Sequence, residues 1–91
     1  MNGFAYLDKY GIMHAVTSKE TALKSSKNSK IVPTDLCDGE GYLDENGMNV
    51  FINASEKTFS HGRNKNREEK LSETEFARRY PKTYALYRKL I

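Results

Sequence analysis

Two short apolar runs near the start of the chain flank a sequence that favours a turn. The runs cover residues 4–7 and 12–16, and both have the length of a strand. Asp8 and Gly11 occupy the first and fourth positions of the turn between them. An Asp side chain can accept a hydrogen bond from the backbone ahead of it, and Gly tolerates the positive φ that follows a type I turn. The pattern therefore predicts a β-hairpin over residues 4–16.

A second hairpin is predicted over residues 41–53. Its turn, residues 44–47, has the sequence Asp-Glu-Asn-Gly, and Asn-Gly is among the strongest hairpin signals because both residues tolerate positive φ. The acidic and Gly-rich residues 35–41 before it are expected to form a loop. A further short strand is expected around residues 57–59.

Between the hairpins the sequence predicts a helix and one more strand. Thr17 and Glu20 have the spacing of a capping box, in which each side chain bonds the backbone N–H of the other residue. They predict a short helix over residues 19–27, after the first hairpin. Residues 30–32 then form a strand. Because Pro33 lacks a backbone donor, this strand either ends there or lies at the edge of a sheet.

The two hairpins share part of their sequence. Aligning residues 6–24 on residues 42–60 matches Tyr, Leu, Asp, Gly and Glu at a constant offset. Duplication and convergence on the same turn chemistry both remain open explanations. The alignment sets His14 opposite Val50 and predicts that His14 lies on the inward face of its strand, together with Ile12.

The stretch Gly-Tyr-Leu-Asp-Glu-Asn-Gly at residues 41–47 resembles the hairpin of WG-type bacterial repeats. The Trp-Gly pair that defines those repeats is absent, because the chain contains no Trp. We attribute the resemblance to shared turn chemistry, and it implies no membership of that family.

The last third of the chain begins with a polar stretch and continues with signals for helices. Residues 60–70 contain no large apolar side chain, which predicts a flexible polar loop. Residues 72–91 form a C-terminal helical segment. Ser72 is its predicted cap, with Glu75 completing a capping box.

Proline divides the C-terminal segment into two helices. Pro81 disfavours helical geometry at the residue before it and removes one hydrogen bond. We therefore expect helices over residues 73–79 and 82–90 that meet at a bend. An apolar stripe should run along both of them, composed of Phe76, Tyr80, Tyr84, Tyr87 and Ile91.

Together these elements predict an α+β fold in a single domain, residues 1–91. We expect a small antiparallel or mixed sheet of about four to six strands, made of two β-hairpins plus one extra strand. The short helix and the bent C-terminal helix pair should cover one face of this sheet. The predicted core is Phe4, Tyr6, Ile12, Val16, Leu23, Ile31, Val50, Ile52, Phe76, Tyr84 and Leu90.

The composition predicts an ordered chain and also indicates where in the cell it is located. Six Tyr and four Phe argue against a disordered chain, which would contain few aromatic residues. No apolar run reaches the roughly 18 residues that span a bilayer, and no signal peptide is expected at the start. The single cysteine, Cys37, excludes an internal disulfide. These features predict a soluble cytoplasmic protein that does not contact a membrane.

The sequence contains no convergent catalytic motif. A catalytic base would have to be His14 or His61. We expect His14 to be a hydrogen-bonded strand residue and His61 to be solvated in the polar loop. Cys37 stands between two aspartates, which disfavour a reactive thiolate. The spacing of Cys and His matches no zinc motif, and residues 35–44 do not fit the frame of an EF-hand. We therefore expect no enzyme activity, no cofactor and no metal.

Positive charge is concentrated near the C-terminus. Residues 61–91 carry nine Lys or Arg and four Glu, whereas residues 1–60 carry six Lys and eight Asp or Glu. Such a segment can bind phosphates or an acidic partner, and it can equally be a solvated helix face. The candidate residues for binding nucleic acid or an acidic partner are Arg63, Lys65, Arg67, Arg78, Arg79, Lys82, Arg88 and Lys89.

These observations rank three classes of function. The first is a non-catalytic binding, regulatory or accessory module that contacts a protein partner or a second copy of itself. The alternative is nucleic-acid binding through the basic C-terminal third. A small enzyme comes third, because no acid–base site can be assigned.

Overall fold

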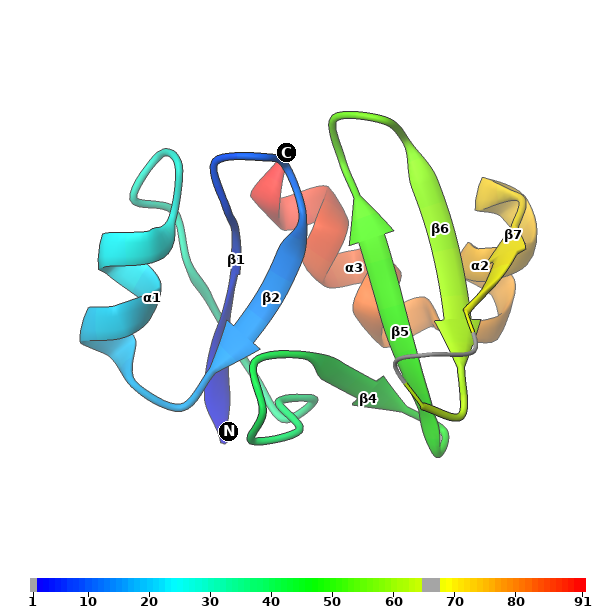
Figure 1. The fold of residues 1–91 in the computed structure, drawn as a ribbon, viewed down its shortest axis with the longest axis horizontal. Coiled ribbons are helices and arrows are strands. Elements are labelled where there is room, and N and C mark those ends of the chain that lie inside the picture. Colours follow the sequence, from blue (N-terminus) through cyan, green and yellow to red (C-terminus); the bar gives the residue numbers. More distant parts are fainter. Residues whose placement is uncertain (1, 65–67) are drawn as a thin grey trace.

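The described part of the chain, residues 2–64 and 68–91, forms two antiparallel sheets and three helices (Figure 1). This computed structural model confirms the predicted α+β class. Sheet A has the strand order β2-β1-β3, and sheet B has the order β4-β5-β6-β7. The strands are β1 (Gly3–Leu7), β2 (Met13–Val16), β3 (Val32–Thr34), β4 (Leu43–Glu45), β5 (Met48–Asn53), β6 (Thr58–Gly62) and β7 (Glu69–Leu71), and the helices are α1 (Lys19–Ser25), α2 (Glu73–Arg79) and α3 (Pro81–Leu90).

The first hairpin closes as its turn residues predict. The N–H of Gly11 donates to the carbonyl oxygen of Asp8 at 2.9 Å, and Gly11 has a φ of 87°. The Asp8 carboxylate accepts from the backbone N–H of Tyr10 and of Ile12, at 2.9 and 3.0 Å. Turn chemistry within five residues is therefore enough to define this hairpin.

The second hairpin turns through Asn46 and Gly47, as its sequence predicts. Their φ values are 54° and 79°, so both residues adopt the left-handed conformation of a two-residue hairpin turn. Glu45 pairs with Met48 across the turn. The Asn-Gly pair thereby determines the register of β4 on β5.

The registers of the two hairpins differ by one residue, which makes the predicted orientation of β2 wrong. Leu7 pairs with Met13 in the first hairpin, whereas Leu43 pairs with Val50 in the second. The structural counterpart of Val50 is therefore Met13, which is 2% exposed. His14 lies on the opposite face and is half-buried. A shift of one residue exchanges the two faces of a strand.

Sheets A and B join at the far end of β5. β4 pairs only with the first half of β5. Beyond it, Ile12 forms a β-bridge with Asn53, and the N–H of Ala54 donates to the carbonyl oxygen of Gly11 at 2.8 Å. A Cβ on Gly11 would clash with the side chain and the backbone nitrogen of Ser55. Glycine is required there by this close approach as well as by the turn.

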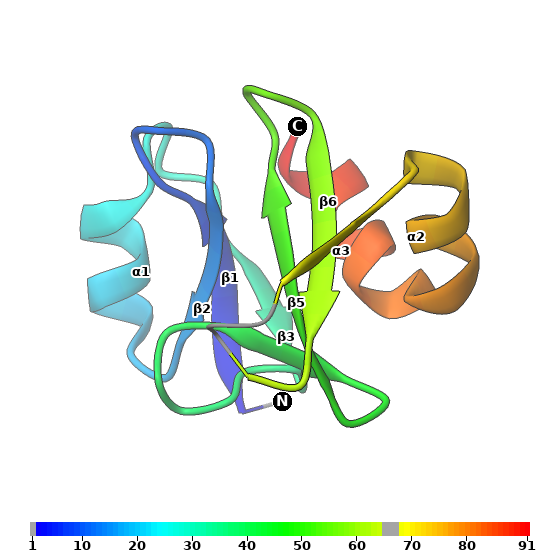
Figure 2. The ribbon, with the colours of Figure 1, turned by 45° about the vertical axis from the view of Figure 1, so that its right-hand side comes forward.

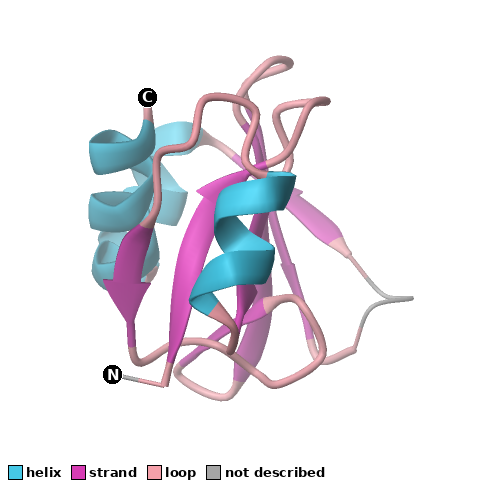
Figure 3. Cartoon of the chain, turned by 90° about the vertical axis from the view of Figure 1, so that its left-hand side faces the viewer, coloured by secondary structure: helices cyan, strands magenta, loops and turns pink. Residues whose placement is uncertain are grey.

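The helices lie on both sides of the strands, so the expectation of one sheet with one covered face is wrong. α1 packs against β1 and β2 on the outer face of sheet A (Figure 1, Figure 3). α2 contacts β6, and α3 contacts β1, β3 and β4, from the other side (Figure 2). Because α3 contacts strands of both sheets, it holds the two sheets around one core.

Local helix signals place α1 almost correctly. Its cap is Ser18, whose hydroxyl accepts from the N–H of Thr21 at 3.2 Å, and not Thr17 as predicted. Ala22 is its buried residue, whereas Leu23 is 40% exposed. The strand after the helix runs through Pro33 at the edge of sheet A, which agrees with the expected edge position.

The predicted loop over residues 60–70 is wrong at both ends. β6 extends to Gly62, and β7 begins at Glu69 and pairs with β6. Residues 65–67 lie outside the described residues. The ends of the stretch form strands because β5 supplies a partner for β6, which then supplies one for β7.

The C-terminal helices lie within one residue of their predicted bounds. The hydroxyl of Ser72 caps α2 by accepting from the N–H of Glu75 at 3.1 Å. The Glu75 carboxylate bonds Arg78 at 2.6 Å. Tyr80 forms the junction between the helices, and Pro81 is the first residue of α3. Proline costs no hydrogen bond at this position, because the first N–H groups of a helix have no acceptor within the helix.

One apolar cluster fills the space between the sheets and the C-terminal helices. Of the predicted core, Tyr6, Val50, Ile52, Phe76 and Leu90 are buried. The others are half-buried or exposed, namely Phe4, Ile12, Val16, Leu23, Ile31 and Tyr84, and the predicted stripe residue Ile91 is 53% exposed. The cluster is composed of Ala5, Leu7, Met13, Ala15, Cys37, Leu43, Val50, Ile52, Phe59, Phe76, Tyr80, Leu86, Tyr87 and Leu90.

Candidate binding groove

A groove of about 350 Å³ lies where β2 meets the outer face of sheet B. Side chains alternate along β5 and β6, so those that do not enter the core face this groove. Ile52 and Phe59 pair on the core face, and Phe51 and Ser60 pair on the groove face. The groove is lined by Ile12, His14, Tyr42, Phe51, Ile52, Asn53, Thr58, Ser60 and Glu68.

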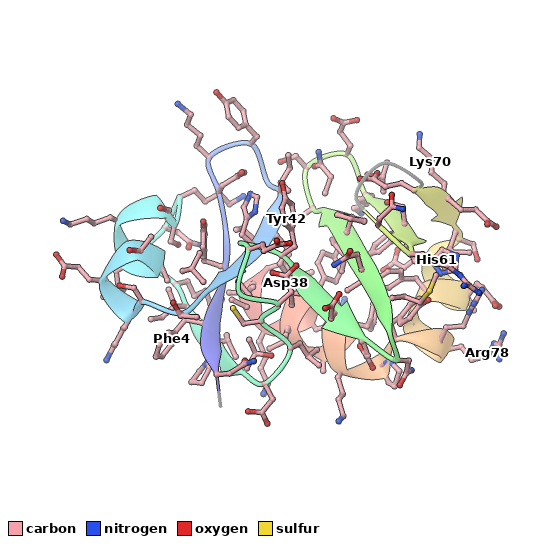
Figure 4. All side chains as sticks on the ribbon, turned by 60° about the horizontal axis from the view of Figure 1, so that its bottom comes forward. Phe4, Asp38, Tyr42, His61, Lys70 and Arg78 are labelled. Carbon is pink, nitrogen blue, oxygen red and sulfur yellow. The ribbon has the colours of Figure 1, made fainter. Side chains whose placement is uncertain are left out.

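Three of the lining residues form a row of aromatic rings. The ring centres of His14 and Tyr42 are 5.8 Å apart, and those of Tyr42 and Phe51 are 5.9 Å apart. Tyr6 extends the row behind His14 at 5.5 Å. Figure 4 shows Tyr42 in the middle of the molecule, between β2 and β5. The row therefore crosses from sheet A to sheet B.

Two acceptors hold the ring of His14. Its Nε2 lies 2.9 Å from Oδ2 of Asp8, and its Nδ1 lies 3.1 Å from the carbonyl oxygen of Gly41. Burial alone would raise the pKa of Asp8. The hydrogen bonds from His14, Ile12 and Tyr10 outweigh that effect and hold the pKa below its usual value.

The Asp8–His14 contact predicts a stability difference that depends on pH. Because the pKa of Asp8 is lower in the folded chain than in the unfolded chain, its ionised form stabilises the fold above the unfolded pKa of about 4. This contribution is lost as the pH falls through the folded pKa. D8N should therefore be less stable than the wild type by about 1 kcal/mol at pH 7.

Urea unfolding between pH 7 and pH 3 tests this prediction. The gap between wild type and D8N should be constant near neutral pH and should narrow as the pH falls below about 4, because Asp8 is then protonated first in the unfolded chain and, at still lower pH, in the folded chain. A gap of constant size across this range would contradict the assigned contact.

The same two contacts limit what His14 can do as a catalyst. A general base needs a free ring nitrogen within hydrogen-bond reach of the proton it removes. Both nitrogens of His14 already face an oxygen acceptor. Ser60 lines the same groove, but His14 offers it no uncommitted nitrogen. His14 is thus the hydrogen-bonded strand residue that we expected, and it serves as a fixed wall of the groove.

The second histidine is also structural, and its predicted solvation is wrong. His61 is 5% exposed, and its Nδ1 lies 2.6 Å from the hydroxyl oxygen of Tyr80. Burial raises the pKa of Tyr80, so the phenol keeps its proton at neutral pH. The pair connects β6 to the junction between α2 and α3. No sequence pattern near His61 indicated this partner, which lies 19 residues away.

The predicted basic residues are spread over several elements. Arg63 is exposed after β6, and Lys65 and Arg67 lie outside the described residues. Arg78 pairs with Glu75, and the Arg79 guanidinium lies 5.8 Å from the centre of the Tyr80 ring. The three remaining cations are exposed on α3, namely Lys82, Arg88 and Lys89. Of these eight residues, none of the six that the structure describes lines the groove.

Sequence reasoning did not find the groove. Its only local indication is the placement of polar residues on alternate positions of β5 and β6, at Asn53, Thr58 and Ser60. That alternation indicates that one face of each strand lies outside the core. It does not indicate which other element lies against that face. The neighbouring wall, His14, was assigned to the wrong face of its strand.

Outside the groove, the described residues form no cluster typical of a catalytic or metal site. Cys37 is buried, and its Sγ lies 3.5 Å from the carbonyl oxygen of Ala15. Within residues 2–64 and 68–91, no three His, Cys, Asp or Glu side chains converge as a metal ion would require. No helix in the described ranges is both long and apolar enough to cross a membrane.

Comparison with known proteins identifies no relative. No protein-family model matches the sequence, and no curated protein or solved structure matches it significantly. Function must therefore be argued from the groove itself.

Proposed function

We propose that this chain is a non-catalytic binding module that holds a short segment of a partner protein in the groove between its sheets. The observation that carries the proposal is the row of rings formed by His14, Tyr42 and Phe51. Aromatic side chains exposed in a groove supply large contact areas at low cost in side-chain entropy. A row of them suits an extended peptide, whose side chains dock between rings.

The size and polarity of the groove support the same class of ligand. A volume of about 350 Å³ is at the lower end for ligand sites and holds only a few side chains. Thr58 and Ser60 place hydroxyl groups beside the rings. Such groups orient a ligand by hydrogen bonding while the rings provide the apolar contact.

A screen of an array of short peptides with the full chain tests this proposal. Y42A and F51A should each weaken the binding of selected peptides by at least about tenfold, since an aromatic anchor contributes roughly 1.5 kcal/mol or more. Y10A is the matched control, because Tyr10 is 64% exposed at the tip of the first hairpin and outside the groove. Peptides that bind Y42A and F51A as well as the wild type would refute the groove as the binding site.

Nucleic-acid binding is the second candidate function. Arg79, Lys82, Arg88 and Lys89 are exposed on α2 and α3, where cations can contact phosphates. If they do, affinity for RNA or DNA should fall steeply with salt, and the double variant R88E/K89E should lose it. Binding that is absent or independent of salt would remove this candidate. The cytoplasmic location also stays a prediction.

A further inference from the structure

We propose that His14 is a proton-controlled clamp, which attaches the loop of residues 38–42 to β2 when its ring carries two protons and releases that loop when the ring is neutral. The clamp is a property of the fold and goes beyond the proposed function. It rests on the two contacts of the ring. Nε2 lies 2.9 Å from Oδ2 of Asp8, and Nδ1 lies 3.1 Å from the carbonyl oxygen of Gly41.

The chemistry of the two partners determines where the ring protons must lie. A backbone carbonyl oxygen can only accept a hydrogen bond. Burial would raise the pKa of the Asp8 carboxyl, but its hydrogen bonds hold that pKa below the usual value, so the group is ionised at neutral pH and is also an acceptor. A neutral imidazole has one N–H, whereas an imidazolium has two. Both contacts of His14 are therefore hydrogen bonds only in the imidazolium form.

When the ring loses one proton, the bond to Gly41 is the one that should break. A hydrogen bond to an ionised carboxylate is roughly twice as strong as one between neutral groups. The contact with Asp8 is also the shorter of the two. The remaining proton therefore stays on Nε2. The bare Nδ1 then faces the carbonyl oxygen of Gly41, and the lone pairs of the two atoms repel each other.

The loop that contains Gly41 closes on itself and contacts β2 through this carbonyl group. Oδ1 of Asp38 accepts from the N–H of Tyr42 at 3.0 Å, and the N–H of Asp38 donates to the carbonyl oxygen of Tyr42 at 3.0 Å. The Gly41 carbonyl oxygen also accepts from a backbone N–H of β2, at a longer distance of 3.4 Å. Because Tyr42 follows Gly41 and lines the groove beside His14, the ring proton controls how firmly this wall of the groove is attached to sheet A.

The other titratable groups around the ring change charge in a different pH range. Within the described part of the chain they are Asp8, Glu40 beside Gly41 in the loop, Glu68 in the groove, and Tyr6 and Tyr42, whose ring centres lie 5.5 and 5.8 Å from that of His14. Phenols ordinarily titrate near about pH 10 and carboxylic acids near about pH 4, whereas histidine is the side chain that ordinarily changes charge between about pH 5 and pH 8. In that range the ring of His14 is therefore the group of this cluster that switches.

An NMR titration of the isotope-labelled full chain from about pH 5 to about pH 8.5 tests the clamp. The ring nitrogen shifts should show that His14 loses its proton from Nδ1, and the carbonyl carbon shift of Gly41 should change with the same midpoint. In D8N the new amide can donate to Nε2, so the neutral ring keeps its proton on Nδ1 and its bond to Gly41. The change at Gly41 should then fall below about a third of the wild-type value.

Two further variants complete the test. H14Q should abolish the change at Gly41, because an amide side chain does not titrate. E20Q is the matched control for D8N, since Glu20 is exposed on α1 outside the groove, and it should leave the titration of Gly41 unchanged.

Several outcomes would overturn the clamp. One is loss of the proton from Nε2 of His14 instead of Nδ1. Another is a Gly41 carbonyl that does not follow His14, or that titrates as strongly in D8N or H14Q as in the wild type. A ring that keeps both protons throughout the range would also overturn it, because the contact would then be permanent. None of these measurements uses a peptide, so the clamp and the proposed function can fail independently.

Discussion

E45A should lower the free energy of unfolding by about 3 kcal/mol. Glu45 is 5% exposed, and its carboxylate accepts from the N–H of Thr83 at 2.8 Å and from the Thr83 hydroxyl at 2.7 Å. It also accepts from the N–H of Lys82 at 3.1 Å. These backbone groups open α3, whose own cap residue, Tyr80, makes no side-chain capping bond. Glu45 on β4 thus caps a helix that is distant in sequence.

The size of the loss in stability follows from the hydrogen-bond donors that E45A leaves without an acceptor. Loss of a helix cap costs about 0.5–2 kcal/mol, and a buried donor without a partner costs about 1–3 kcal/mol. Thr83 is fully buried, so water cannot replace the lost acceptor without a rearrangement. Because a chain of this length has a total stability of roughly 5–14 kcal/mol, the loss should be large and easily measured.

Urea unfolding of three variants tests the cap. E45Q keeps one acceptor oxygen and should lose only about 1–2 kcal/mol. E69A, on the exposed edge strand β7, removes the same residue type and should change stability by less than about 0.5 kcal/mol. If E45A unfolds at the same urea concentration as E69A, Glu45 does not cap α3.

Features determined within a few residues were predicted from the sequence. The turn at Gly11, the Asn-Gly turn of the second hairpin and the Ser72 cap all depend on neighbours in the chain. Their geometry follows from allowed φ values and from side chains that bond adjacent backbone groups. Pro81 likewise starts α3 because proline suits the first turn of a helix.

Features that depend on distant partners were not predicted. The acceptor Glu45 and its donors in α3 are 37 and 38 residues apart, and Glu45 had been assigned only to a turn. The orientation of His14 was wrong because the two hairpins have different turns, which an alignment at constant offset does not detect. His61 stands between Ser60 and Gly62 in a polar stretch, and its buried partner Tyr80 lies 19 residues away in the sequence.

The groove belongs to this second group for a physical reason. Its walls come from β2, from the residue before β4, and from β5 and β6. Whether these elements meet depends on the bridge between Ile12 and Asn53, which joins the two sheets. Local propensity carries no information about such a bridge, since it depends on tertiary packing. The groove is therefore a property of the assembled fold.

F59A should be strongly destabilising, with a loss of about 4 kcal/mol. Phe59 is 2% exposed on β6, and its ring centre lies 5.5 Å from that of Phe76 in α2 and 5.5 Å from that of Tyr87 in α3. The ring thus joins sheet B to both C-terminal helices. Replacing a buried Phe by Ala costs about 3–5 kcal/mol, because transfer energy is lost and a cavity remains.

F51A is the matched control for this prediction. Phe51 lies on the neighbouring strand, on the opposite face of sheet B, and is only half-buried. The same atoms are removed, yet neither C-terminal helix loses a contact, so we expect a loss of no more than about 1.5 kcal/mol. Urea unfolding of both variants gives the comparison, and equal losses would contradict the assignment of Phe59 to the core and Phe51 to the groove.

Unfolding and peptide-binding measurements on F59A and F51A together distinguish a residue needed for stability from one needed for binding on the same sheet. The core face, with Phe59, must stay packed for the chain to fold. The groove face, with Phe51, keeps an aromatic side chain half-exposed beside Tyr42. A folded F51A chain that no longer binds peptides would show that the ring is present for recognition. If F51A instead lost as much free energy of unfolding as F59A, the ring would be structural. The proposal that the groove is a binding site would then lose its main support.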